Sequence, residues 1–134
     1  MKPVEAARRW ASVWQGAWEA LDVESIVALY GEDAVLSTAP FRVPYRGPDG
    51  VRSYVARVFG EEERPRVRMG RQVVEGDCAA IPWWATLREE GVDVTLAGTS
   101  LLRFDASGLV AEQWDTWSVT QGHVDPPEEW SPFT

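Results

Sequence analysis

The chain has 134 residues, of which 45% are hydrophobic and eight are tryptophan, so a large aromatic core or an aromatic cavity is expected. Its 21 acidic residues outnumber its 13 basic residues, which gives a formal net charge of −8 at pH 7. Nucleic acids and anionic membranes are therefore poor partners, because both require a positive footprint.

The scarcity of cysteine and histidine limits the chemistry of the chain. A lone Cys78 excludes an internal disulfide, and a lone His123, expected at the surface, leaves no spaced ligands for a zinc site. We therefore expect neither a metal nor another cofactor. The sequence also lacks a signal-peptide pattern and an apolar run of membrane-spanning length, so we expect a cytoplasmic protein.

The first predicted helix runs from about Pro3 to Leu21. Its apolar residues recur at spacings of three and four, which is typical of an amphipathic helix. Trp10, Trp14 and Trp18 would then stack on one face. Core packing explains Trp10 best, whereas Trp14 and Trp18 are candidates for the wall of a cavity.

Two more helices are expected before residue 60. Asp22 is a good N-cap for a helix that continues to Tyr30, where Gly31 would stop it. The segment 47–49, Gly-Pro-Asp, opens a third helix, because proline is tolerated at the first helical position and an acid favours the positive end of the dipole. The expected buried face of this helix consists of Val51, Tyr54, Val55, Val58 and Phe59.

Strand character dominates the rest of the chain. We expect the charged segment 61–65, which contains Glu61, Glu62 and Glu63, to be a solvated loop. Pro82 implies a bulge or a sheet edge within its strand. The expected strands span residues 34–38, 41–46, 66–75, 78–88, 92–104 and 108–119.

This order of elements predicts an α+β fold with three helices laid on one face of a curved antiparallel sheet. The last four strands would form a meander. We expect one domain over residues 1–134, with a core at about 5–119 and an irregular tail at 120–134. A cone of this shape leaves a cavity between helices and sheet.

One carboxylate in the last predicted strand needs an explanation, because aspartate is depleted in strands. Alternation of side chains places Gln113, Asp115 and Trp117 on one face and Trp114 on the other. Two interpretations remain open. Asp115 either faces a covered pocket, where it would serve chemistry, or faces solvent and pairs with an arginine.

Three segments of the chain carry a family resemblance. They read DVESIVALYGEDA over residues 22–34, YRGPDGV over 45–51, and LRFD from residue 102, continuing to Trp117. With them the chain resembles the nuclear transport factor 2-like superfamily, specifically its SnoaL-like and ketosteroid isomerase-like members. The resemblance covers nearly all of residues 5–119 and implies a cone-shaped α+β fold. It leaves the activity open, because the superfamily contains isomerases, cyclases, hydrolases, dehydratases and binding modules.

Matched by position, the isomerases' catalytic residues are replaced in this chain. Their tyrosine, base and oxyanion aspartate fall on Trp14, Thr38 and Ser100. Steroid isomerisation by the family mechanism is therefore not expected, because Trp14 cannot act as a near-neutral acid and Thr38 cannot accept a proton from carbon at pH 7.

Asp115 matches the strand carboxylate of the limonene-epoxide-hydrolase-like members. The Arg and Asp that accompany it there fall near Trp83 and Ala85, so these partner charges are missing. The resemblance thus implies a scaffold that retains one carboxylate in an aromatic pocket.

We accordingly expect a cofactor-independent enzyme that acts by proton transfer on a hydrophobic cyclic small molecule, as an isomerase, cyclase, dehydratase or hydrolase. Asp115 would be the catalytic acid/base. The alternative is a non-catalytic ligand-binding or dimerisation module. The expected substrate-binding residues are Trp14, Trp18, Thr38, Tyr54, Ile81, Trp83, Ala85, Ser100, Gln113 and Trp117.

A homodimer is also expected. The sheet face opposite the helices carries Trp84 and Trp114, which a monomer would leave exposed, and exposed aromatic patches usually mark interfaces.

Overall fold

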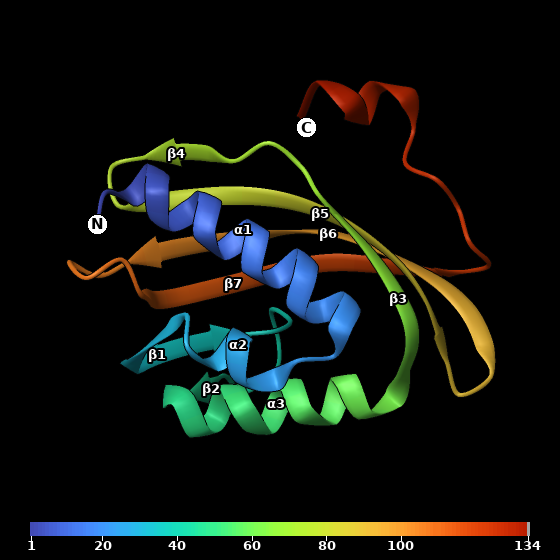
Figure 1. Cartoon of the computed structure of the whole chain (residues 1–134), viewed down its shortest axis with the longest axis horizontal. Coiled ribbons are helices and arrows are strands. Elements are labelled where there is room, and N and C mark those ends of the chain that lie inside the picture. Colours follow the sequence, from blue (N-terminus) through green and yellow to red (C-terminus); the bar gives the residue numbers. More distant parts are fainter. Residues whose placement is uncertain (134) are drawn as a thin grey trace.

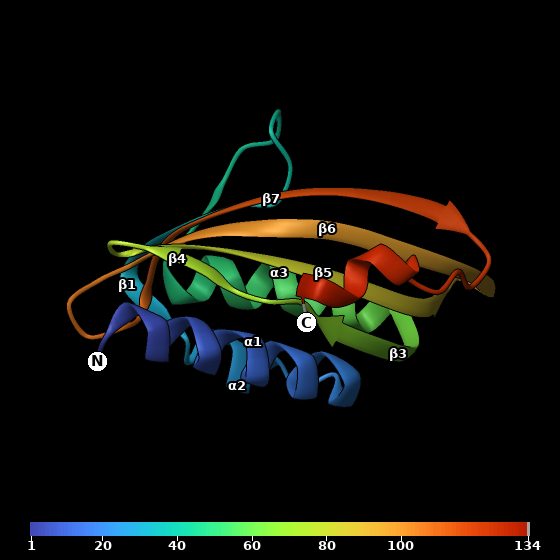
Figure 2. The same cartoon turned by 90° about the horizontal axis from the view of Figure 1, so that it is seen from above.

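The computed structural model describes residues 1–133, apart from the side chains of 131–133. Its three α-helices lie on one face of a strongly curved sheet (Figures 1 and 2). The helices are α1 (Pro3–Ala20), α2 (Val23–Val27) and α3 (Gly47–Glu61). The strands are β1 (Tyr30–Ser37), β2 (Tyr45–Arg46), β3 (Glu62–Met69), β4 (Val73–Glu75), β5 (Cys78–Glu89), β6 (Val92–Phe104) and β7 (Val110–Gln121), followed by a 3-10 helix, η1 (Glu128–Phe133).

The strands form one sheet in the order β2-β1-β7-β6-β5-β3, and β4 also pairs with β5. All pairs are antiparallel except β1 with β7, which is parallel. The predicted α+β fold, with three helices on a curved and mostly antiparallel sheet, is confirmed. No helix within residues 1–133 is both long and apolar enough to cross a membrane.

Helix α1 packs along the concave face of the sheet through one face of its own. Trp10, Trp14 and Trp18 are all at least nine-tenths buried, and small alanines between them bring the helix close to the strands. The helix ends at Leu21, which adopts the left-handed conformation that closes many helices. The predicted amphipathic helix is confirmed.

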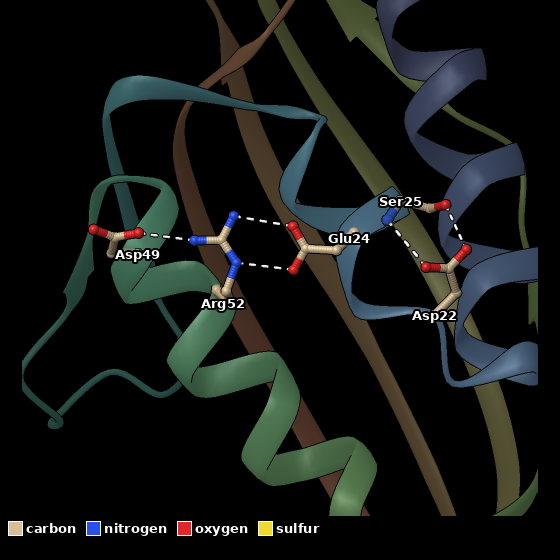
Figure 3. Close-up of polar contacts among 5 residues, drawn as sticks. All are labelled: Asp22, Glu24, Ser25, Asp49 and Arg52. Atoms are coloured by element: carbon tan, nitrogen blue, oxygen red, sulfur yellow. Dashed lines mark hydrogen bonds and ion pairs between the residues drawn. The ribbon is translucent and has the colours of Figure 1, made fainter.

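Helix α2 is short, and polar side chains hold its N-terminal half (Figure 3). Asp22 caps its first turn by accepting a hydrogen bond from the Ser25 backbone at 3.2 Å. Arg52 on α3 reaches Glu24 through two bonds of 2.8 and 3.0 Å, and its third nitrogen reaches Asp49 at 2.8 Å. This exposed fork fixes the position of α2 against α3, although such pairs add little stability.

The predicted extension of α2 to Tyr30 is wrong. Tyr30 and Gly31 begin β1, and Tyr30 lies opposite Val110 of β7. The backbone N–H of Val110 donates to the carbonyl of Leu29 at 2.8 Å, directly before the strand. Pairing of Tyr30 with Val110, on a strand far away in the chain, thus overrides the local helical spacing.

The predicted loop at 61–65 is also wrong. Helix α3 runs to Glu61 and β3 begins at the next residue, where Glu62 pairs with Glu89 of β5. The side chain of Glu62 is only 8% exposed. A segment that the charge pattern assigns to solvent therefore supplies a carboxyl group to the interior.

The predicted strand at 66–75 is two strands, because the chain leaves the sheet between Met69 and Val73. Pro82 of β5 lies opposite this gap, and its carbonyl accepts a hydrogen bond from Gly70 at 2.7 Å. The pairing of β5 with β6 continues through Pro82 without a shift. The expected bulge in β5 is therefore absent. The alternative, a sheet edge, holds locally, because the proline, which has no N–H, lies opposite the break between β3 and β4.

The C-terminal tail doubles back from the end of β7 (Figure 1). Trp84 donates its indole N–H to the carbonyl of Val124 at 2.8 Å, and its ring packs edge-on against Trp130 at 6.1 Å. Arg68 lies over the ring of Trp130 at 5.2 Å. The prediction that a monomer leaves Trp84 exposed is wrong, because the tail of the same chain covers part of it. His123 is exposed, as expected.

Candidate functional site

A pocket of about 260 Å³ lies between the concave face of the sheet and helices α1 and α3. Its wall is mainly aromatic. Five of the eight tryptophans line it, together with Tyr54 and Phe59 of α3. These tryptophans are Trp10, Trp14, Trp18, Trp83 and Trp117.

The pocket brings together Asp115 and seven of the ten expected binding residues. Three expected residues do not line it. Ile81 and Ala85 are fully buried on β5, while Thr38 is buried directly after β1. The residues that do line the pocket with Asp115 are Trp14, Trp18, Tyr54, Trp83, Ser100, Gln113 and Trp117.

Thr38 acts on the pocket indirectly. Its carbonyl accepts the indole N–H of Trp117 at 2.8 Å, which fixes that partly exposed ring at the pocket wall. Its hydroxyl is buried without a hydrogen-bond partner among the described residues.

Gly98 lies on β6 between Trp83 and Trp117, where a side chain would collide with both. It lies directly opposite both residues in the register. A Cβ at this position would come within 2.8 Å of the Trp83 ring and within 2.7 Å of the Trp117 Cβ. The missing side chain therefore makes room for the aromatic wall.

Asp115 is held by hydrogen bonds to only one of its two oxygens. Ser100 is its direct partner on β6 and donates to Oδ1 at 2.7 Å. Gln113 lies two positions earlier on the same face of β7 and donates to Oδ1 at 2.9 Å. Within residues 1–133 no hydrogen bond reaches Oδ2. Since no ion pair forms there either, the interpretation of Asp115 as a surface residue paired with an arginine does not hold.

Tryptophans fix the direction of these bonds. Trp10 and Trp14 donate to the hydroxyl of Tyr30 at 3.4 and 3.2 Å, and that hydroxyl donates to Oε1 of Gln113. An indole N–H can only donate, so the tyrosine proton must point onward. The amide nitrogen of Gln113 then faces Asp115.

A second branch of hydrogen bonds reaches Asp115 from Trp83 through Ser100, and a tryptophan fixes its direction in the same way. Trp83 donates to the Ser100 hydroxyl at 3.1 Å, which leaves the serine proton for Asp115. Both branches thus end as donors on Oδ1. A proton carried by Asp115 must therefore sit on Oδ2, because a protonated Oδ1 would face two donors.

Burial raises the pKa of Asp115 to about 6, although the hydrogen bonds from Ser100 and Gln113 lower it. Desolvation disfavours the charged carboxylate, whereas donors stabilise it. At neutral pH the group is therefore mostly ionised but can accept and return a proton readily.

Glu62 is a second carboxyl group of the pocket, and sequence reasoning missed it. Its Oε1 accepts the indole N–H of Trp18 at 2.7 Å. Its pKa is raised to about 7, mainly by burial; the bond from Trp18 lowers it, and the charges of Glu89 and Glu61 raise it. A spacing of three from Phe59, on the buried face of α3, was the signal that could have distinguished Glu62 from its neighbours.

Tyr30 was missed because it was assigned to a helix. It is 4% exposed, and burial raises the pKa of its hydroxyl far above the usual range. The N–H of Trp14, an expected substrate-binding residue, donates to Tyr30.

A family model described as a SnoaL-like domain matches residues 7–113. No curated protein sequence matches the chain. Solved structures with the same fold are numerous.

SalBIII, named as an epoxide hydrolase/cyclase-like enzyme in pyran ring formation in the polyether salinomycin, has a TM-score of 0.77 and 13% identity, over 89% of this chain and 97% of that chain. A protein from Catenulispora acidiphila DSM 44928 with a ketosteroid isomerase-like fold, solved with trimethylamine, has a TM-score of 0.72 and 17% identity, over 80% of this chain and 83% of that chain. A protein from Shewanella denitrificans OS-217, whose name likens it to SnoaL-like polyketide cyclases, has a TM-score of 0.71 and 18% identity, over 87% and 92%. At these identities the likeness establishes the fold alone.

Proposed function

We propose that this chain, which belongs to the SnoaL-like domain family, is a cofactor-independent enzyme in which Asp115 transfers a proton to or from a hydrophobic cyclic small molecule. The observation that carries the proposal is the one-sided bonding of Asp115. Its Oδ1 accepts from Ser100 and Gln113, while Oδ2 has no partner among the described residues. A carboxylate held in this way, in a pocket, suits general acid/base catalysis.

The proposed mechanism follows from the bonding of each oxygen. With its pKa at about 6, Asp115 begins a cycle at neutral pH as a base. Oδ2 takes a proton from the ligand while Oδ1 keeps its two donors. The same Oδ2 then returns the proton to another ligand atom, which completes an isomerisation, or to an oxygen, which completes a ring closure or opening. The ring chemistry named for SalBIII supports the last two variants.

The tryptophans support a hydrophobic ligand. Each of the five pocket indoles donates its N–H to a protein oxygen. They can therefore offer the ligand only carbon and π surface. Polar selection falls to the few remaining groups, above all Asp115 and Glu62, as is usual for small-molecule sites.

The test begins with the ligand. Native mass spectrometry of freshly purified protein should reveal a carried small molecule, and turnover of that molecule or its precursors should then be measured. Asp115→Asn should keep binding and lose about a thousandfold or more in rate, because an amide cannot take up a proton at neutral pH. Asp125→Asn, an exposed change in the tail, is the matched control.

Two outcomes would contradict the proposal. Undiminished turnover by Asp115→Asn would end the role of this carboxylate. Release of the carried molecule unchanged by the wild-type protein would favour the alternative function, a non-catalytic ligand-binding module on the same fold.

We also infer that two copies associate through the convex face of the sheet. Leu101 and Trp114 are cross-strand partners there and are 51% and 50% exposed. An apolar pair of this kind suits the centre of a two-fold interface. Sedimentation at micromolar concentration should show a dimer that Trp114→Glu dissociates. A wild-type protein that sediments only as a 15.0 kDa species would rule the dimer out.

A further inference from the structure

We propose that the ligand of this pocket carries a positively charged amine, which Glu62 and the ring of Trp18 hold where α3 meets β3. This inference rests on the proposed binding function of the same pocket and specifies its substrate class. Asp115 would then act on the uncharged part of the ligand, at the other end of the Trp18 and Trp83 ring pair.

The charge of Glu62 has no counter-ion in the protein. The side chain is 8% exposed, and within residues 1–133 no basic side chain lies within ion-pair distance of it. Arg57 also lines the pocket, but it bonds to the hydroxyl of Tyr45 at 3.2 Å and lies over the ring of Tyr54. A buried carboxylate without a cation is costly, so a cationic ligand group would offset the cost.

The residues that line the pocket carry a net negative charge, which also favours a cationic ligand. Four acidic residues line the pocket against two arginines. The acidic residues are Glu61, Glu62, Glu89 and Asp115, and the arginines are Arg42 and Arg57. Three of the four acids, all but Asp115, belong to the region where α3, β3 and β5 meet.

Trp18 joins the carboxyl group to an aromatic wall. Its N–H occupies Oε1 of Glu62, and Oε2 has no hydrogen-bond partner among the described residues. Its ring lies 5.9 Å from Trp14 at 78° and 5.6 Å from Trp83 at 68°. Steeply inclined indoles beside a carboxylate match the chemistry that recognises ammonium groups, since tryptophan is the best ring for cation–π contact.

The titratable and charged groups that face Glu62 make binding depend on pH. Glu61 of α3 and Glu89 of β5 oppose its ionisation, and Tyr54 of α3 senses its charge. Glu19 of α1 is engaged with the backbone of Val67 and stays outside the pocket. A permanent cation binds the ionised form of Glu62, so its affinity should rise as pH rises through about 7.

The experiment uses two probes that differ in charge and hardly in shape. Choline and 3,3-dimethyl-1-butanol differ in one position, where a charged nitrogen replaces a carbon. Binding can be followed by calorimetry and by the indole N–H signals of the eight tryptophans, on the wild-type protein and on Glu62→Gln and Glu63→Gln. Glu63 is the exposed neighbour of Glu62 and lies outside the pocket, so its variant is the matched control.

At about pH 8 choline should bind the wild-type protein about tenfold more tightly than the alcohol, and its addition should shift the Trp18 signal. Glu62→Gln should lose that preference and its pH dependence while keeping its affinity for the alcohol. Glu63→Gln should behave as the wild type does.

Equal affinities of the two probes in the wild-type protein would overturn the amine proposal, as would an unchanged preference in Glu62→Gln or a failure of both probes to bind. None of these results bears on turnover by Asp115→Asn, which tests the proposed enzyme separately. If the carried ligand is uncharged and Asp115 converts it, the proposed enzyme function would stand and the amine proposal would be wrong.

Discussion

Asp115 and Glu62 are two carboxyl groups of one pocket, and they differ in how the fold surrounds them. Desolvation is the main cause of the raised pKa in both. At Asp115 two donors on one oxygen lower the pKa again. At Glu62 only one indole donor lowers the pKa, and two nearby glutamates raise it. Glu62 accordingly titrates higher, at about 7 against about 6.

The two groups show that the value of a pKa and the oxygen that carries the proton are determined by different features of the surroundings. At Asp115 the network from Tyr30 and Trp83 reserves Oδ1 for acceptance, so the proton has one place to bind. At Glu62 a single bond from Trp18 leaves the other oxygen unassigned. Burial is therefore the main cause of how readily each carboxyl group holds a proton, donors and nearby charges adjust the pKa, and directional donors also decide which oxygen holds the proton.

Breaking the network at its source should have the largest effect on stability. Tyr30→Phe removes a buried hydroxyl and leaves two indole N–H groups and the Gln113 carbonyl without their partner. Each buried unpaired group costs about 1–3 kcal/mol, so we expect a loss of about 4 kcal/mol in the free energy of unfolding. Urea denaturation measures it.

Tyr45→Phe is the matched control, because that hydroxyl bonds only to the exposed Arg57. A loss in Tyr30→Phe no larger than in this control would contradict the directional network.

Removing the carboxyl group of Glu62 should change the pH dependence of stability. Its pKa of about 7 in the folded protein lies above the ordinary value of 4.5. Stability from this group is thus fully present below about pH 4.5 and is lost as pH rises through about 7. Relative to Glu62→Gln, the wild-type protein should lose about 3 kcal/mol between about pH 4.5 and 8. Denaturation at both pH values tests this, and parallel curves for the two proteins would contradict it.

Asp115→Asn should change the pH dependence of stability less than Glu62→Gln does, and over a lower range of pH. The folded pKa of about 6 lies above the ordinary 3.8, so stability is lost as pH rises from about 4 through about 6 and then levels off. Residual exposure of the side chain reduces the effect to about 2 kcal/mol. The difference between the variant and the wild type, measured in steps from about pH 4 to 8, should flatten about one pH unit before that of Glu62→Gln. A common midpoint for both would contradict the comparison.

The sequence predicted the Asp115 side of the pocket better than the Glu62 side. The strand period of two placed Gln113, Asp115 and Trp117 on one face, which in the structure lines the pocket, and the hairpin between β6 and β7 is local enough to read from its turn. The bounds predicted for β6, Val92–Phe104, agree with the structure.

Features that depend on distant pairing could not be predicted in the same way. Tyr30 joins the sheet through β7, and no local pattern distinguishes that strand from the end of a helix. Glu62 is buried because Trp18 and β5 cover it, whereas Glu61 and Glu63 on either side are exposed. The charges of three identical side chains in a row do not tell which one turns inward, and only the spacing of three from the buried Phe59 singles out Glu62.

The smallest expected effect is a change in the pKa of Glu62 when its one hydrogen-bond donor, the indole of Trp18, is removed. Trp18→Phe keeps an aromatic ring and removes the indole N–H that stabilises the ionised carboxyl group. The pKa of Glu62 should therefore rise above its wild-type value. Trp83→Phe removes an indole at the Asp115 end, but Ser100 still donates to Oδ1, so the pKa of Asp115 should move less. Carboxyl carbon NMR over a pH series measures both groups in each variant. A larger shift at Asp115 than at Glu62 would show that the indole donors act through the network rather than by direct contact, and would reverse the contrast drawn between the two groups.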